Sequence, residues 1–380
     1  MSMKDALNSA IYGARRSAIR EYSRLAAETP GCVALTLGEP DFDTPQPVEA
    51  AVDEAFAHHE THYIPNNGSP ALREAIADFE RTQNGMDYTA DEVIVTIGAT
   101  EALFVALFGI LNPGDEVIVP TPAFVLYEEI IGLCRGRFVP LDTRADAFQI
   151  DPDRLRAAIT PHTKAIVLNS PNNPTGCIYT PQSLAAVREA VAGRDIFVIC
   201  DDVYRQLIYT EQYHSFAEFR DLRKQILVVQ SFSKPYAMTG WRMGYLLADA
   251  AVKERLELLH QFMVVSAPTP FQRPCIEALR QSVEPMRSVY RKRRALVLAR
   301  LEAMGLDMTE PLGAFYVFPS IEKFGLPSAE FCRRMIREAG LAATPGDCFG
   351  ADGYIRLTYC YGDEALQTGL DRLEQFISTL

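Results

Sequence analysis

The chain has 380 residues, of which 48% are apolar and 23% charged, a composition typical of an ordinary globular protein with room for two domains. Its formal net charge of −12 argues against nucleic acid and anionic membrane surfaces as principal partners. The eight cysteines include no CxxC pair, and the first twenty residues contain no apolar signal-peptide core, so we expect a reduced, cytoplasmic protein.

The first strongly patterned stretch, residues 93–111, carries a single charge at Glu101 and is long enough to suggest a transmembrane helix. Its first five residues are mainly β-branched, Gly98 follows them, and the remainder favours helix. Acidic residues flank both ends, where a membrane-spanning helix would have basic anchors. We therefore predict a strand, a glycine turn and a helix, and no membrane span.

Short, uniformly apolar runs recur along the chain after this stretch, and segments of helical character separate them. Runs of this kind are typical of strands that are buried on both faces of a parallel sheet. Their alternation with helices predicts a layered α/β domain with a mostly parallel central sheet. The predicted strands are 93–97, 117–119, 165–168, 196–200, 226–229 and 244–248, and the predicted helices are 99–111, 123–135, 181–193 and 250–262.

The pattern changes after about residue 283, where strands become fewer and helices longer. We expect residues 284–380 to form a smaller α+β domain, which the N-terminal segment 1–44 joins, beside a large domain of residues 45–283. The predicted elements are a long helix after 283, a strand at 315–318, a helix at 328–339 capped by Ser328 and Gly340, a strand at 354–358, and a last helix with an apolar stripe at Leu366, Leu370, Leu373, Ile377 and Leu380.

Polar side chains follow four of the predicted strands of the large domain. Because ligands bind beyond the carboxyl ends of strands in an open parallel sheet, we expect these side chains to meet at one site. They are Gly98, Ala99 and Thr100 after the first strand, Asn169 to Gly176 after the third, Asp201, Asp202 and Tyr204 after the fourth, and Ser231, Ser233, Lys234 and Arg242 after the fifth.

This set of residues suits one cofactor in particular. Gly98-Ala99-Thr100 at a helix N-terminus offers backbone N–H groups to a phosphate, and Arg242 adds a charged donor. A lysine near another cation and partly desolvated, such as Lys234, has a lowered pKa and can form a Schiff base. An aspartate such as Asp201 would keep a heteroaromatic nitrogen protonated. Together these features describe a site for pyridoxal 5'-phosphate (PLP).

Other chemistries lack their fingerprints in this chain. There is no GxGxxG, GxxxxGK[ST] or GxSxG sequence, which disfavours a nucleotide-dependent enzyme and a serine hydrolase. His58, His59 and His62 lie close in sequence but not in the HExxH order of a zinc site, so we predict no metal centre.

Seven motifs, in order along the chain, resemble those of fold-type I PLP-dependent aminotransferases of class I and II, the aspartate, aromatic and alanine aminotransferase group. Each motif alone is weak, but together they span residues 37 to 359. They are Leu37-Gly-Glu-Pro-Asp-Phe-Asp43, Tyr63-x4-Gly68-x3-Leu72-Arg73, Gly98-Ala-Thr100, Asn173-Pro-Thr-Gly176, Asp201-x2-Tyr204, Ser231-Phe-Ser-Lys234 with Arg242, and Arg356-Leu-x-Tyr359.

The resemblance implies roles for the residues that match. Lys234 would form the internal aldimine with PLP and move the substrate proton, while Asp201 would pair with the pyridinium nitrogen. Tyr204 and Asn173 would hydrogen-bond the phenolate oxygen. Phe124 would stack on the ring, where many relatives have Tyr or Trp. The phosphate would be held by Ala99, Thr100, Ser231, Ser233 and Arg242.

The same resemblance implies how substrate and a second subunit take part. Arg356 would bind the substrate α-carboxylate in a two-pronged fork that lysine could not imitate, and the backbone of Gly38 and the side chain of Asn173 would assist. Tyr63 would reach the phosphate of the neighbouring subunit. We therefore expect a homodimer with shared active sites.

The reaction implied is a ping-pong transfer of the amino group of an L-amino acid to a 2-oxo acid through the Lys234 aldimine. A β-elimination C–S lyase would need the same cofactor residues and stays open as an alternative. A catalytically silent relative is disfavoured by the presence of Lys234, Asp201 and Arg356. No second arginine for the substrate side chain can be identified. Tyr12, Ile19, Phe124 and Tyr63 suggest an apolar or mixed pocket for an aromatic, aliphatic or bulky acylated donor.

Overall fold

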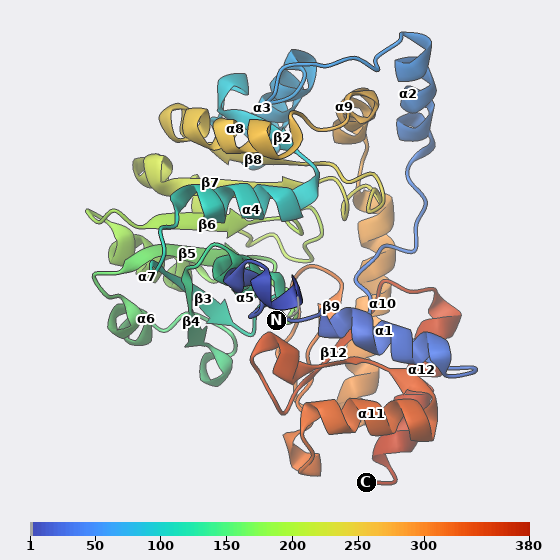
Figure 1. Cartoon of the computed structure of the whole chain (residues 1–380). Helices are drawn as coiled ribbons and strands as arrows, with labels where there is room; N and C mark the ends of the chain where they lie inside the picture. Colours follow the sequence, from blue (N-terminus) through green and yellow to red (C-terminus); the bar gives the residue numbers. More distant parts are fainter. Residues whose placement is uncertain (1–2) are drawn as a thin grey trace.

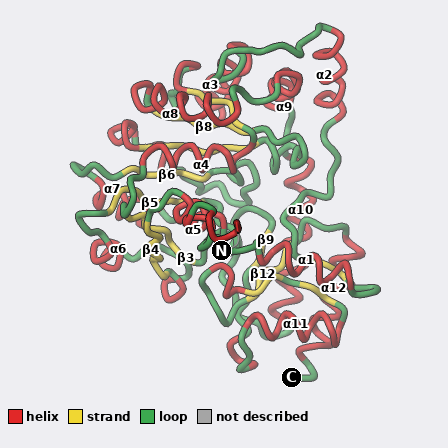
Figure 2. Tube along the Cα trace, in the orientation of Figure 1, coloured by secondary structure: helices red, strands yellow, loops and turns green. Residues whose placement is uncertain are grey.

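A seven-stranded sheet is the central feature of the computed structural model, which describes residues 3–380 (Figures 1 and 2). β8 runs antiparallel to both of its neighbours, and all other neighbours in the sheet are parallel, so the predicted, mostly parallel α/β sheet is confirmed. In spatial order the strands are β2 (Val93–Thr96), β8 (Gly244–Ala248), β7 (Ile226–Ser231), β6 (Phe197–Asp201), β5 (Thr163–Asn169), β3 (Glu116–Thr121) and β4 (Arg137–Asp142).

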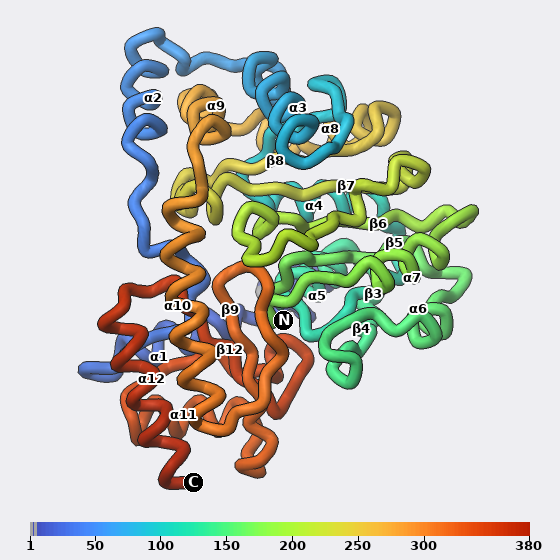
Figure 3. Tube along the Cα trace, turned by 180° about the vertical axis from the view of Figure 1, so that it is seen from behind, coloured from blue at the N-terminus to red at the C-terminus, as the bar shows by residue number. Residues whose placement is uncertain are grey.

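The two faces of this sheet have separate cores. In β5, Ile166 and Leu168 pack with α7, whereas Ala165 and Val167 point to the other face and pack with α4. Because successive side chains of a strand alternate between faces, such a strand must be apolar throughout. α4 and α5 lie in front of the sheet in Figure 1, and α6 and α7 lie nearer the viewer in Figure 3.

Twelve α-helices lie within residues 3–380, and several begin at a proline or at a capping side chain, as at Ser69 and Thr180. They are α1 (Ala18–Glu28), α2 (Gln46–Ala57), α3 (Pro70–Asn84), α4 (Gly98–Ile110), α5 (Leu126–Leu133), α6 (Pro152–Ala158), α7 (Pro181–Val191), α8 (Ala250–Val264), α9 (Gln272–Arg280), α10 (Glu284–Ala303), α11 (Ser328–Ala339) and α12 (Asp363–Ile377).

A third core joins the two ends of the chain. Leu35 and α1 pack with α10, α11 and α12, and the blue α1 lies beside the red C-terminal helices in Figure 1. Arg293 of α10 donates to Asp41 and to Asp363, at 2.8 Å in each case. The short strands here are β1 (Val33–Ala34), which pairs with β10 (Leu341–Ala342), and β11 (Thr344–Pro345), β12 (Ile355–Thr358) and β9 (Tyr316–Val317), which form an antiparallel sheet.

Some boundaries differ from those expected. The helix expected at 123–135 begins only at Leu126, because the N–H of Ala123 donates to the carbonyl of Phe349 and holds this segment against the turn at Gly346–Phe349. Ser328 is not an N-cap, since it already lies within α11, and its N–H donates to Asp352. Leu380 lies beyond the end of α12 and is 42% exposed.

The stretch 93–111 folds as β2, a turn at Ile97 and α4, as predicted. Within residues 3–380, no helix combines the length and the apolar character needed to cross a membrane.

Candidate active site

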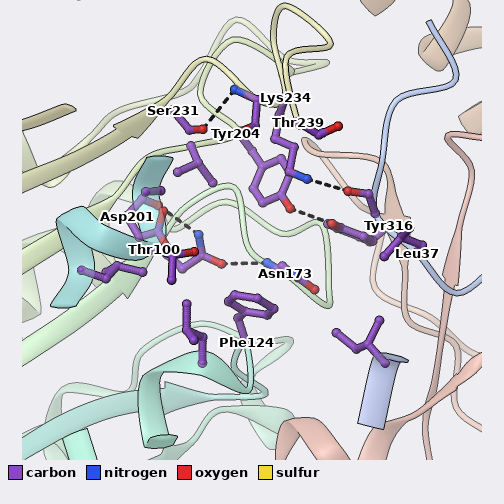
Figure 4. Close-up of a pocket in the computed structure, with 18 of the residues that line it drawn as sticks. Leu37, Thr100, Phe124, Asn173, Asp201, Tyr204, Ser231, Lys234, Thr239 and Tyr316 are labelled. Carbon is purple, nitrogen blue, oxygen red and sulfur yellow. Dashed lines mark hydrogen bonds between the residues drawn. The ribbon is translucent and has the colours of Figure 1, made fainter. Parts of the chain in front are cut away.

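A cavity of about 250 Å³ opens at the carboxyl ends of β5, β6 and β7, where the sheet meets the third core (Figure 4). Its walls come from the start of α4, from α1, from the segment before Glu39, and from β9 and β12. Every residue to which the sequence assigned a cofactor or substrate role lies at this cavity, except Tyr63. Those that line it are Gly38, Ala99, Thr100, Phe124, Asn173, Asp201, Tyr204, Ser231, Ser233, Lys234, Arg242 and Arg356. Asp202 and Tyr12, which the sequence also suggested for the site, do not line it.

Lys234 follows β7 and points across the cavity toward Gly38, whose carbonyl oxygen accepts a hydrogen bond from its Nζ at 2.6 Å. Burial is the main reason why its pKa is lowered to about 8; Cys360 and Glu39 oppose this effect, and Arg242 adds to it. A fraction on the order of a tenth of the amine is then neutral near pH 7, which is the form that attacks a carbonyl carbon.

Asp201, the last residue of β6, is buried and only half satisfied. Its Oδ2 accepts a hydrogen bond from the hydroxyl of Tyr127 at 2.5 Å, while its Oδ1 has no hydrogen-bond partner within the described residues. Burial raises the pKa of Asp201 to about 6, and the hydrogen bond from Tyr127 acts in the opposite direction. A buried carboxylate oxygen without a donor is unfavourable, so this oxygen is suited to an N–H of a bound molecule.

The start of α4 forms the end of the cavity where an anion would be stabilised. The N–H of Ile97, just before the helix, is occupied by Glu101 Oε2 at 2.5 Å, while those of Ala99 and Thr100 belong to the first turn, which lacks intrahelical acceptors. The guanidinium of Arg242 lies so close to Gly98 that a Cβ there would be 2.5 Å from its Nη2. Helix N-terminus and guanidinium together suit a phosphate.

Arg356 lies on the opposite side of the cavity and is 1% exposed. Its Nη1 donates to Asn173 Oδ1 at 2.8 Å, its Nη2 donates to the carbonyl of Thr36, and its guanidinium lies 4.7 Å from the centre of the Tyr316 ring. No acidic side chain in the described part of the chain forms an ion pair with it. A buried cation without a counter-ion is costly, so Arg356 is suited to a carboxylate ligand.

Two residues that contact this site, Tyr127 and Tyr316, were not singled out from the sequence, and Asn169 was predicted only as one of the polar residues that follow a strand. Asn169 ends β5, and its amide links the carbonyl of Asp201, at 2.9 Å, to the N–H of Asn173, at 2.8 Å. Its position directly after a buried strand was a usable signal. Tyr316 pairs with Tyr204, and Tyr127 lies in a helix of ordinary amphipathic sequence, so neither stood out.

Tyr63 is 89% exposed and lies away from the cavity, near His62 and Thr269. Its expected role requires a second subunit, so a single chain does not test it. Asp202, which the sequence also placed at a strand end, turns away from the cavity and pairs with Arg205 and Ser215.

Residues 30–373 match the model of a family described as aminotransferase class I and II. The chain belongs to this family. It is 40% identical to the aspartate/prephenate aminotransferase of Thermus thermophilus over 352 residues, which is 91% of each chain. It is 39% identical to a Bacillus subtilis protein named "Probable N-acetyl-LL-diaminopimelate aminotransferase", over 95% of this chain and 93% of that one. A solved structure of Thermus thermophilus aspartate aminotransferase with maleate superposes with a TM-score of 0.92 at 38% identity, over 97% and 99% of the two chains.

Membership makes this aminotransferase a PLP-dependent enzyme of fold type I. The residues at the cavity fit that cofactor. The unpaired Oδ1 of Asp201 suits the protonated ring nitrogen, and the partly neutral Lys234 suits the aldehyde. The start of α4 and Arg242 suit the phosphate.

Proposed function

We propose that this aminotransferase transfers the amino group of an L-α-amino acid to a 2-oxo acid, with Lys234 as the residue that binds PLP and moves the substrate proton. One observation carries the proposal. A lysine with a lowered pKa, an unpaired carboxylate oxygen of Asp201 and an unpaired, buried Arg356 all face one cavity.

The other site residues predicted from the sequence also have roles in this proposal. Bound there, PLP would supply an electron sink for the bond that breaks at the substrate Cα. Asp201 would hold the ring nitrogen in its protonated form, Tyr204 and Asn173 would donate to the ring oxygen, and Phe124 would cover one ring face. The phosphate would be held by Ala99, Thr100, Ser231, Ser233 and Arg242.

In this proposal, the contacts of the substrate α-carboxylate place the bond that reacts next to Lys234. Arg356 would bind the α-carboxylate through its two-pronged guanidinium, assisted by Asn173 and the backbone of Gly38. This fixes the Cα–H bond beside Nζ of Lys234, which accepts the proton when the amine is neutral. Orientation of this kind is worth up to about 7–11 kcal/mol of the activation barrier.

The side-chain pocket is mainly apolar, with one cation at its mouth. Ile19, Leu37, Leu103 and Leu126 contribute to the wall, and the exposed Arg20 lies at the rim. The relatives named above act, by their names, on substrates as different as aspartate, prephenate and a diaminopimelate derivative. The wall supports an aromatic, aliphatic or bulky acylated donor.

We also propose a homodimer with shared sites. The loop at Tyr63 and the end of α8 carry exposed apolar side chains, including Tyr63, Phe262 at 83% and Val265 at 43%. The side chain of Asn66 donates to the carbonyl of Val265 at 2.8 Å, which joins the two segments into one surface. Such a surface favours a second copy, whose cavity Tyr63 would enter.

Two further assignments belong to the proposal. Residues 45–283 would act as the large domain and residues 1–44 with 284–380 as the small one, since the N-terminal segment packs in the C-terminal core. A cytoplasmic location is supported by the eight cysteines, all of which are unpaired.

The test is the visible absorption spectrum of the protein with PLP, recorded before and after single amino acids are added from a panel. We expect a cofactor band that one class of amino acid abolishes and a 2-oxo acid restores. In Lys234→Ala the protein should fold, lose the band, and lose activity by at least about 10²–10⁴-fold.

The matched control is Lys224→Ala, because Lys224 is exposed and distant from the cavity. It should keep both the band and the activity. Full activity in Lys234→Ala would refute the assignment of the lysine. Release of pyruvate and ammonia without an oxo-acid acceptor would instead identify a β-elimination lyase.

A further inference from the structure

Tyr316 of β9 lies at the cavity and contacts groups from both halves of the proposed reaction. It is 1% exposed. Its hydroxyl lies 2.6 Å from the hydroxyl of Tyr204, and this hydrogen bond is drawn as a dashed line in Figure 4. Its ring faces the guanidinium of Arg356, which lies 4.7 Å from the ring centre. The proposed roles of Tyr204 and Arg356 concern the cofactor and the substrate, respectively.

The hydroxyl pair leaves two arrangements for the proton of Tyr204, because either hydroxyl can be the donor. Two hydroxyls at 2.6 Å share a single hydrogen, so one of them donates and the other accepts. No other hydrogen-bond partner of the Tyr316 hydroxyl is found in the described part of the chain. When Tyr316 donates to Tyr204, the proton of Tyr204 is free for an acceptor in the cavity.

The ring has a separate effect on Arg356. The guanidinium is buried, and its partners are neutral oxygens of Asn173, Thr36 and Thr344 together with two aromatic rings, that of Tyr316 at 4.7 Å and that of Phe349 at 5.1 Å. An aromatic face attracts a cation and restricts its orientation without neutralising its charge. Arg356 therefore keeps its full positive charge for binding a carboxylate, while the aromatic contact restricts the orientation of its guanidinium plane.

Tyr316 also has no room to move toward Gly38. A Cβ at Gly38 would lie 2.0 Å from the Tyr316 hydroxyl, so the backbone of Gly38 lies directly against it. The same Gly38 accepts the hydrogen bond from Lys234. The ring is consequently held by Tyr204, Arg356 and Gly38 together.

We propose that Tyr316 is a positioning residue with two separable effects: its hydroxyl directs the proton of Tyr204 toward the ring oxygen of the cofactor, and its ring orients Arg356 for the substrate α-carboxylate. The inference rests on the proposed function. It adds a residue that sequence reasoning passed over, and it predicts that the two effects respond to different substitutions.

Tyr316→Phe removes the hydroxyl and keeps the ring. We expect the pH midpoint of the visible cofactor band to move upward by roughly half to one pH unit, because the negatively charged ring oxygen is less well stabilised. The KM for the amino donor should stay within about twofold of the wild-type value, since the ring still faces Arg356. In a Tyr204→Phe background the same substitution should cause no further shift.

Tyr316→Leu removes both features. It should show the same shift of the midpoint and, in addition, a roughly tenfold higher KM for the donor. Tyr316→Met serves in its place if the leucine variant does not fold, as judged by thermal unfolding. Tyr290→Phe is the matched control, because Tyr290 is a buried tyrosine of the same core whose hydroxyl has no hydrogen-bond partner.

The outcomes separate this inference from the proposed function. Absence of a cofactor band in the wild-type protein would refute the function itself. A normal wild-type band with an unshifted midpoint in Tyr316→Phe would refute the hydroxyl effect, as would an equal shift in Tyr290→Phe or a further shift in the Tyr204→Phe background. An unchanged KM in Tyr316→Leu or Tyr316→Met would refute the ring effect.

Discussion

The charge of Asp201 is decided by two opposing effects. Burial disfavours the carboxylate and raises the pKa of Asp201 to about 6, whereas the hydrogen bond donated by Tyr127 favours the carboxylate. The side chain is therefore still mainly ionised near pH 7. Ionisation matters here because only a carboxylate would keep a pyridine nitrogen protonated.

Replacing Tyr127 by phenylalanine should move this balance. In Tyr127→Phe we expect the pKa of Asp201 to rise by roughly one unit, because the charged form loses a donor while burial is unchanged. As the pH is lowered, the affinity for PLP should then begin to fall at a higher pH than in the wild-type protein. A titration of the PLP dissociation constant between pH 5 and 8 on the cofactor-free protein would measure this.

The raised pKa of Asp201 also determines how this residue changes the free energy of unfolding with pH. The folded protein binds a proton at Asp201 more tightly than the unfolded chain does. This contribution to stability is full below the ordinary aspartate pKa of 3.8 and is lost as the pH rises through about 6. Tyr179→Phe, which alters a buried tyrosine in a different core, should leave both the affinity profile and this window unchanged.

Among the elements, α4 shows how a local sequence fixes one end of the site. Glu101 reaches back so that its Oε2 accepts from the N–H of Ile97, and its Oε1 lies 2.7 Å from Nδ1 of His260 in α8. The other nitrogen of that imidazole lies 2.8 Å from the carbonyl of Asn66. The turn that precedes the helix is thus held from two sides.

Glu101 is thus an anchor for the start of α4, and removing its side chain should both destabilise the fold and weaken PLP binding. In Glu101→Ala, the N–H of Ile97 and the imidazole of His260 lose their partner, and we expect the free energy of unfolding to fall by about 1–3 kcal/mol. The affinity for PLP should fall too, because the N–H groups of Ala99 and Thr100 lose their fixed direction.

Chemical denaturation and a PLP binding isotherm would measure both effects. Glu254→Ala on the exposed side of α8 is the control and should change stability by less than about 0.5 kcal/mol. If both variants bound PLP as tightly as the wild-type protein, the anchor would have no role in the site.

The strands of the central sheet and the residues that follow them show what can and cannot be predicted from the sequence. β5, β6 and β7 were predictable because both of their faces are buried, which requires uninterrupted apolar runs. β4 was missed because it is an edge strand that includes Pro140 and buries only Leu141, so it lacks an uninterrupted apolar run. Lys234 and Asp201 stood out because they directly follow buried strands. Tyr127 and Tyr316 did not, because their contacts come from distant parts of the chain.

For the whole molecule, the site depends on contacts between the sheet and the third core. Tyr204 and Leu207 follow β6 in sequence, yet they pack in the core of α10 to α12. The carbonyl of Leu207 accepts from the N–H of Ala314 at 2.8 Å. The chain after β6 is thereby built into the neighbouring core, so cofactor and substrate residues are positioned by the same packing.

The proposed dimer gives a prediction at this scale. Phe262→Asp places a charge on the apolar surface around Tyr63 and α8 and should convert the dimer mainly to monomer, with a loss of PLP affinity. Sedimentation velocity would measure the association state. Leu380→Asp, at an exposed position beyond α12, is the control and should remain dimeric. A monomeric wild-type protein with full activity would contradict the proposal of shared sites.

A continuous series of hydrogen bonds runs from Arg356 through Asn173 and Asn169 to Asp201. All four residues are buried, so the separation between the carboxylate-binding cation and the carboxylate that faces the ring nitrogen is set by the folded backbone. In an α-amino acid the amino and carboxylate groups share one carbon atom, whereas β- and ω-amino acids place one or more methylene groups between them. A fixed separation would accept the first arrangement and misplace the amino group in the second. This enzyme should therefore discriminate among donors by the distance between amino and carboxylate groups, whatever side chain its apolar wall prefers.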